Sequence, residues 1–114
     1  DSVGRSHAFF LWHPGARMSP SERLAFYKHV LTVNGPYVQI FKACEEAGEY
    51  IRALTRFFAK EGTREQLIGE LADLQITSEQ MALLASITPE EVQAEVERKL
   101  ERLSRRTDFG SAPK

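Results

Sequence analysis

The sequence predicts an all-α protein in which four main helices form a bundle completed by homo-oligomerisation. Two observations lead to this fold class. Helix-start signals recur along the chain, and after each one apolar residues return at intervals of three and four. In addition, no stretch shows the alternation of a strand over a convincing length. A length of 114 residues is that of one domain.

The first helix is predicted to begin at Ser19-Pro20-Ser21-Glu22. Ser19 can cap it, Pro20 suits the first helical position, and Glu22 completes a capping box. The helix is expected to end at Asn34-Gly35-Pro36, because Gly and Asn tolerate positive φ and Pro cannot continue the hydrogen bonding. Its apolar positions are Leu24, Tyr27, Val30 and Leu31.

A second helix is expected from Pro36 or Tyr37 to Lys60, closed by Glu61-Gly62. Its apolar residues follow a 4-3-4-3-4 spacing, which predicts a seam facing the rest of the bundle. The members of this seam are Ile40, Cys44, Ala47, Ile51, Leu54 and Phe58.

Two more capping boxes predict the remaining helices. Thr63 and Gln66 begin a third helix that runs to about Ala85, and Thr88-Pro89 with Glu91 begins a last helix that runs to Arg106. The apolar positions are Leu67, Leu71, Leu74 and Met81 in the third helix, and Val92, Val96, Leu100 and Leu103 in the last. The second and third helices are apolar over more than one face, and a short chain has limited capacity to bury them. We therefore expect a homodimer or homotetramer.

Residues 19–106 form the predicted domain, between an N-terminal arm (1–18) and a flexible tail (107–114). Trp12 of the arm is expected to anchor a neighbouring subunit, with stacking on a base as the alternative. A net charge of −1 argues against binding to nucleic-acid polymers or anionic membranes. No segment approaches the roughly 20 apolar residues of a membrane helix. A single cysteine, Cys44, cannot form an internal disulfide, which favours a cytoplasmic protein.

Acidic pairs on the second and third helices carry the functional prediction. Glu46 with Glu49, and Glu70 with Asp73, are each spaced i,i+3 and so share one helix face. If the two helices run antiparallel and side by side, the four carboxylates converge and repel each other unless protons or a hard divalent cation are present. Their chain neighbours are small and leave room for an ion: Ala47, Gly48, Gly69 and Ala72. The alternative is that both pairs lie on solvated faces.

The ligand types favour one class of metal. The three histidines (7, 13 and 29) lie outside both acidic pairs, which argues against a di-iron site. Zinc prefers Cys or His ligands, and the lone Cys44 is far from any His. An all-carboxylate set predicts Mg²⁺, with Mn²⁺ as an alternative.

The pattern Glu45-Glu46-x-x-Glu49 followed by Glu70-x-x-Asp73 resembles the signature of the MazG-like, all-α nucleoside triphosphate pyrophosphohydrolases. Segment 39–51 is similar to that family's second helix, and segment 98–103 to its basic C-terminal helix. The likeness covers about residues 24–106, in the family's order of elements.

The resemblance implies Mg²⁺-dependent hydrolysis of nucleoside or deoxynucleoside triphosphates to the monophosphate and pyrophosphate. It implies a catalytic pair, Glu45 and Glu46, with Glu45 orienting or deprotonating the attacking water or helping to hold a second ion. The implied metal ligands are Glu46, Glu49, Glu70 and Asp73. The implied phosphate-binding residues are Lys99 and Arg102. From the residues themselves, Gln39 is expected to hydrogen-bond a base edge.

Two alternatives stand beside this reading. One is a dCTP- or dUTP-specific pyrophosphatase of the same superfamily. The other is a non-catalytic helical dimerisation or regulatory module that the metal stabilises.

Overall fold

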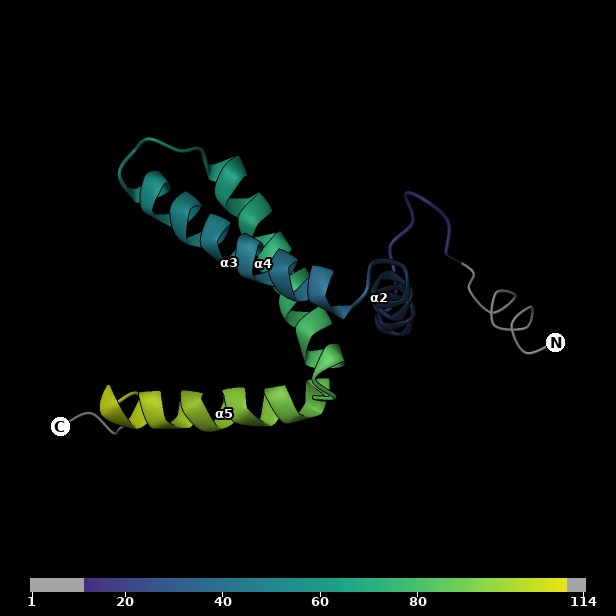
Figure 1. The fold of residues 1–114 in the computed structure, drawn as a ribbon. Helices are drawn as coiled ribbons and strands as arrows, with labels where there is room; N and C mark the ends of the chain where they lie inside the picture. The colour runs from purple at the N-terminus through teal and green to yellow at the C-terminus, as the bar shows by residue number, and fades with distance from the viewer. Residues whose placement is uncertain (1–11, 111–114) are drawn as a thin grey trace.

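A computed structural model describes residues 12–110, which contain four α-helices and no strand (Figure 1). The all-α prediction is confirmed. The helices are α2 (Pro20–Asn34), α3 (Pro36–Phe58), α4 (Arg64–Leu84) and α5 (Pro89–Arg106). Most of the predicted arm lies outside the described residues. None of the described helices is long and apolar enough to cross a bilayer.

Three of the helices begin at the predicted capping boxes. Ser19 Oγ accepts a 3.2 Å hydrogen bond from the Glu22 amide, and Glu22 Oε1 accepts one of 2.9 Å from the Ser19 amide. These bonds satisfy two of the amides that a helix N-terminus leaves without partners. The same reciprocal pairs join Thr63 with Gln66 and Thr88 with Glu91.

The turns between helices contain residues with positive φ. Gly35 separates α2 from α3 with φ of 84°, as its place in Asn34-Gly35-Pro36 predicts. At the end of α3 the left-handed residue is Lys60, with φ of 62°, rather than Gly62. The turn is nevertheless tight, because the Gly62 amide bonds back to the Arg56 carbonyl at 3.2 Å.

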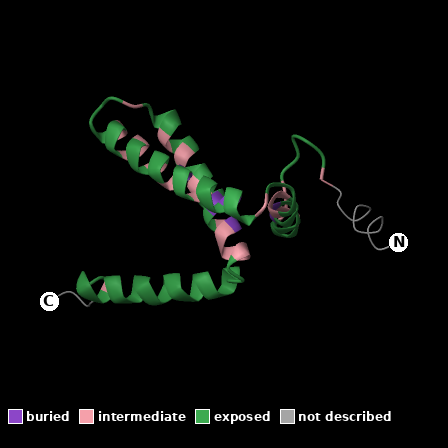
Figure 2. Ribbon diagram, viewed as in Figure 1, coloured by how far each residue is buried: buried purple, intermediate pink, exposed green. Residues whose placement is uncertain are grey.

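The antiparallel α3–α4 hairpin is the main packed unit of the chain, and α2 contacts both of its helices (Figure 1). In contrast, α5 extends away from the hairpin after the turn at residues 85–88 and packs along none of the other three helices. Figure 2 shows buried residues where α2, α3 and α4 meet, and an α5 that is almost entirely exposed. Within residues 12–110, α5 therefore lies apart from the unit that α2, α3 and α4 form.

The predicted seam of α3 is not the surface that meets α4. Ile51 is 60% exposed and Phe58 is 74% exposed, whereas the buried residues of α3 are Gln39 and Glu46. Within residues 12–110 the seam therefore does not face the other helices, because a helical period identifies an apolar face without saying which neighbour covers it. Among the described residues Tyr27 is the one buried hydrophobic side chain. Residues 12–110 thus contain almost no fully buried apolar side chains.

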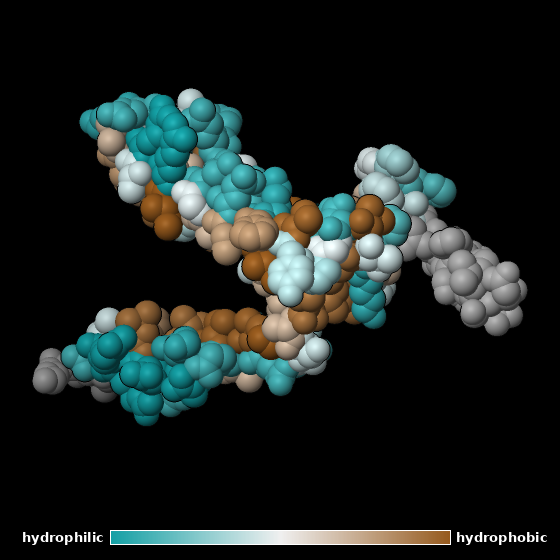
Figure 3. All heavy atoms as spheres, in the orientation of Figure 1, coloured by the Kyte–Doolittle hydropathy of each residue, from teal (hydrophilic) through white to brown (hydrophobic). Residues whose placement is uncertain are grey.

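The amphipathic face of α5 is equally uncovered. Its apolar stripe is exposed along the whole helix and gathers on one side in the space-filling view (Figure 3). The members of this α5 stripe are Val92, Val96, Leu100 and Leu103. An apolar stripe that none of the other described helices covers indicates a surface that another chain or segment covers.

Candidate metal centre

The α3–α4 hairpin brings acidic side chains from both helices together. Carboxylate oxygens of Glu46, Glu70 and Asp73 lie within 4.8 Å of one another. A second group on α3, made of Glu45, Glu46 and Glu49, meets the same distance. Because Glu46 belongs to both groups, the two acidic pairs of the sequence join into one cluster across the hairpin, which we call the acidic cluster.

Glu46 lies at the centre of the acidic cluster and is only 6% exposed. Its Oε1 atom is 3.3 Å from Lys42 Nζ, one helical turn earlier. Its Oε2 atom is buried and has no hydrogen-bond partner among residues 12–110. Glu70 Oε2 is also buried and lacks a partner in this part of the chain. Two buried carboxylate oxygens without donors are costly, so the cluster requires protons or a cation.

The electrostatics of the acidic cluster agree with this requirement. Burial raises the pKa of Glu46 above that of an ordinary glutamate, the Lys42 ammonium opposes the shift, and the Asp73 and Glu49 carboxylates add to it. Burial also raises the pKa of Glu70, together with the charges of Glu49 and Asp73. The shifts mark a site where negative charge is in excess.

The side chains of the acidic cluster fit a hard divalent cation. All of its donors are carboxylates, and neither group contains a histidine or cysteine. Cys44 lies nearby on α3 but is exposed and outside both groups. Oxygen-only donors are those of Mg²⁺, Mn²⁺ or Ca²⁺ sites, and they do not suit zinc.

Glu45 lies at the margin of the acidic cluster. It is exposed, and its Oε1 atom is 3.4 Å from Lys42 Nζ. Lys42 therefore bridges an exposed carboxylate and a buried one. Glu45 is therefore in contact with solvent and is also close enough to contact a ligand at the acidic cluster.

Two grooves lie on either side of the acidic cluster along the hairpin. The first, which we call the amide groove, has a volume of about 300 Å³. It runs from Glu46 and Asp73 to the side-chain amides of Asn34, Gln39 and Gln80. The structure thus brings Gln39 beside the cluster.

The second, which we call the arginine groove, has a volume of about 280 Å³ and lies toward the hairpin turn. It is lined by Arg52 and Arg56 of α3 and reaches Glu49 and Glu70 of the acidic cluster. Sequence reasoning missed both arginines, although their i,i+3 and i+7 spacing from Glu49 could have placed them on its face.

The structure does not bring Lys99 and Arg102 to the acidic cluster. Both lie on α5, which extends away from the hairpin (Figure 1). Lys99 Nζ is instead 3.7 Å from Glu95 Oε1 on its own helix. Within one chain, the two basic residues and the carboxylates belong to separate surfaces.

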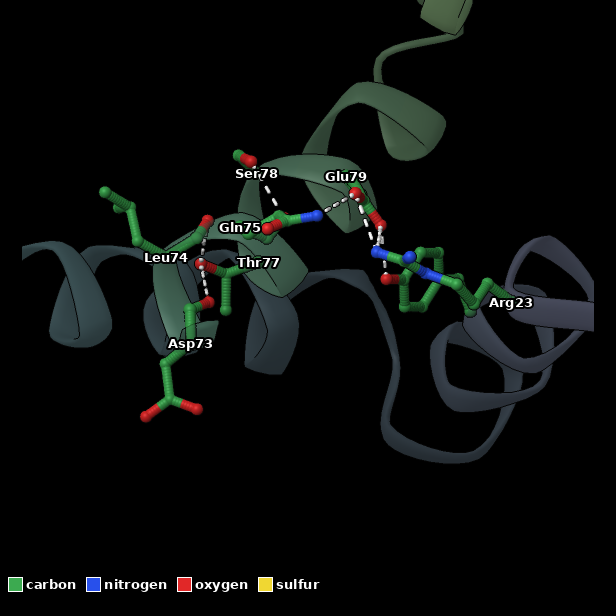
Figure 4. A network of polar contacts seen from close by, with 8 residues as sticks. Arg23, Asp73, Leu74, Gln75, Thr77, Ser78 and Glu79 are labelled. Atoms are coloured by element: carbon green, nitrogen blue, oxygen red, sulfur yellow. Dashed lines mark hydrogen bonds and ion pairs between the residues drawn. The ribbon is translucent and has the colours of Figure 1, made fainter. Parts of the chain in front are cut away.

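A polar contact between α2 and α4 was also missed by sequence reasoning. Arg23 Nη2 donates to both carboxylate oxygens of Glu79, at 2.6 and 2.8 Å, and the Tyr27 hydroxyl donates to Glu79 Oε1 at 2.6 Å. Figure 4 shows this contact beside the Thr77 hydroxyl, which donates to the Asp73 carbonyl. The i,i+4 spacing of Arg23 and Tyr27 indicates a shared face, but nothing local identifies a partner more than 50 residues away. The contact fixes α2 next to the amide groove.

Comparisons of the chain with family models, with curated proteins and with solved structures find no match. The function is therefore inferred from the acidic cluster and the grooves beside it.

Proposed function

We propose that this protein is a Mg²⁺-dependent nucleoside triphosphate pyrophosphohydrolase of the MazG-like kind. It would convert nucleoside or deoxynucleoside triphosphates to the monophosphate and pyrophosphate. The observation that supports the proposal is a pair of buried oxygens, on Glu46 and Glu70, that have no hydrogen-bond partner among residues 12–110 and lie inside a cluster of carboxylates from two antiparallel helices. Such a cluster is unfavourable by itself and suits a hard divalent cation.

In this proposal Glu46, Glu49, Glu70 and Asp73 hold Mg²⁺. When bound, the metal ion would neutralise charge on the phosphate oxygens and lower the pKa of a bound water molecule. Glu45 is exposed beside Glu46 and accepts the proton of the attacking water. Lys42, which contacts both glutamates, offsets part of the cluster's charge before substrate binds.

A triphosphate carries about four negative charges, so it needs cations beyond the metal ion. We assign this role to Lys99 and Arg102 of a second subunit in a homodimer or homotetramer. Two features support the assignment: the α5 stripe is exposed, and α5 lies apart from its own hairpin. Docking of two chains would cover both the α5 stripe and the exposed seam of α3.

The test is a panel of all common NTPs and dNTPs with Mg²⁺, in which monophosphate and pyrophosphate are both quantified. We expect at least one nucleotide to yield the two products in equal amounts. Glu49→Gln and Asp73→Asn should abolish turnover while circular dichroism stays helical. The matched control is Glu65→Gln, an exposed acidic residue on α4 outside the acidic cluster, which should retain activity.

The panel also separates the alternatives. Turnover of dCTP or dUTP alone would identify the pyrimidine-specific enzyme of the same superfamily. If Mg²⁺ raises the melting temperature and no nucleotide yields pyrophosphate, the chain is the non-catalytic module. Full activity of Glu49→Gln or Asp73→Asn would contradict the ligand assignment.

A further inference from the structure

We propose that the amide groove is a nucleobase subsite, in which Gln39 and Gln80 read the edge of the substrate's base. The inference rests on the proposed function, because it assumes that a triphosphate reaches the acidic cluster. It assigns Gln80 a role for which the sequence pattern offers no signal. It also sets the direction in which a nucleotide lies along the hairpin.

Gln39 and Gln80 are buried side chains without a hydrogen-bond partner in the described part of the chain. They are 4% and 6% exposed, one on α3 and one on α4. Neither side chain makes a hydrogen bond to any residue within 12–110, and both line the amide groove. Thr77, which is also buried and lines the same groove, differs in that its hydroxyl donates to the Asp73 carbonyl at 2.9 Å. Their carboxamide atoms are not among the fully buried polar atoms, so the groove leaves them accessible and able to pair with one ligand that enters it.

The chemistry of the amide groove selects the class of ligand. A carboxamide is uncharged and offers both donors and an acceptor, so it suits a neutral edge that carries a donor beside an acceptor. Val38 and Ile76, one from each helix, supply apolar surface at the same groove. The positively charged residue that lines this groove, Lys42, already pairs with two carboxylates. Its Nζ atom is 3.4 Å from Glu45 Oε1 and 3.3 Å from Glu46 Oε1. These features together fit a flat, neutral heterocycle such as a nucleobase.

On the other side of the acidic cluster, the groove is lined by charged side chains instead of neutral amides. The arginine groove presents Arg52 and Arg56, and it reaches the cluster through Glu49 and Glu70. With neutral amides on one side and cations on the other, a nucleotide would place its base toward Gln39 and Gln80. Its phosphates would then lie over the carboxylates, with the terminal phosphate toward the arginines.

The kinetic test compares Gln39→Ala and Gln80→Ala with the unmodified protein over the nucleotide panel with Mg²⁺. Each variant should lose about tenfold to a hundredfold in kcat/KM for the preferred nucleotide, as for one bidentate amide–base contact. Discrimination between nucleotides should fall with it. Gln93→Ala, at an exposed glutamine of α5, is the matched control and should change neither quantity. Unchanged selectivity in both groove variants would overturn the inference while leaving the proposed hydrolysis intact.

A second test measures binding to the unmodified protein. It requires neither a folded variant nor catalytic turnover. Side-chain NH₂ signals of the unmodified protein are followed by NMR while nucleosides, which carry no phosphate, are added without metal. Selective shifts of the Gln39 and Gln80 signals support the base subsite, even where no nucleotide is hydrolysed. The absence of shifts with every nucleoside at millimolar concentration would refute it, even where hydrolysis is observed.

Discussion

Lys42 Nζ lies 3.3 Å from Glu46 Oε1, while the other oxygen of the same carboxylate is buried without a partner among the described residues. One lysine thus pairs with one oxygen of a buried carboxylate that belongs to the same cluster as Glu70 and Asp73, and it leaves the other oxygen without a donor from residues 12–110. The same imbalance should govern both the stability of the protein and its response to metal.

Replacement of Glu46 by Gln should separate stability from metal binding. Without metal, the variant should melt at a higher temperature than the unmodified protein, because it removes a charge repelled by its neighbours. Mg²⁺ at about ten times its Kd should stabilise the unmodified protein by about 1.4 kcal/mol and the variant much less. Differential scanning calorimetry with EDTA and with Mg²⁺ measures both effects. A variant with a full Mg²⁺ response would remove Glu46 from the metal centre.

The Arg23–Tyr27–Glu79 contact should make stability fall in acid. Burial alone would raise the pKa of Glu79, but hydrogen bonds from Tyr27, Gln75 and Arg23 and the charge of Arg23 lower it below 4.5. A carboxylate with a depressed pKa contributes stability above its unfolded pKa, and this contribution is lost as the pH falls through the folded value. Urea unfolding of the unmodified protein and of Glu79→Gln should therefore differ at pH 7 and converge below about pH 4. A constant difference across this range would show that the ion pair contributes nothing.

Tyr27→Phe tests the hydroxyl within the same contact. Loss of its 2.6 Å hydrogen bond to Glu79 should lower the free energy of unfolding by about 1–2 kcal/mol at neutral pH. The aromatic ring remains, so the burial of apolar surface is kept. If the free energy of unfolding is unchanged, α2 is held by packing rather than by this polar contact.

A charge within the α5 stripe should dissociate the oligomer. Leu100→Glu places a carboxylate in the exposed apolar stripe, where burial against a second chain would become unfavourable. Light scattering coupled to size-exclusion chromatography should show the monomer mass. Ala94→Glu introduces the same side chain on the opposite side of α5 and should leave the mass of the assembly unchanged. A monomeric unmodified protein would exclude the proposed homo-oligomer.

Sites shared between subunits can be detected by complementation. Asp73→Asn and the Lys99→Ala/Arg102→Ala double variant should each have little activity alone. When the two are mixed and allowed to exchange subunits as dimers, about a quarter of the full activity should return, since half of the dimers carry one intact site of two. Without recovery, the basic residues of α5 serve their own chain or take no part in turnover.

The sequence alone determined the four helices. Ser19, Thr63 and Thr88 each form a capping box with the residue three positions on, and Gly35 takes the positive φ that its turn requires. These features are local, because each depends on hydrogen bonds or steric limits within a few residues. The i,i+3 spacing of the acidic pairs likewise showed that each pair shares one helix face. The residue types alone showed that a metal ion there would have only oxygen ligands.

Only the tertiary structure decided which faces meet. It placed Gln39 and Glu46, rather than the apolar seam, beside Thr77 and Gln80, and it left α5 packed along none of the other described helices. It also joined Tyr27 to Glu79 and set the carboxamides of Gln39 and Gln80 beside the acidic cluster. Helical periodicity fixes the direction of each side chain relative to its own axis, but the rotation and docking of one helix on another depend on contacts between residues distant in the chain.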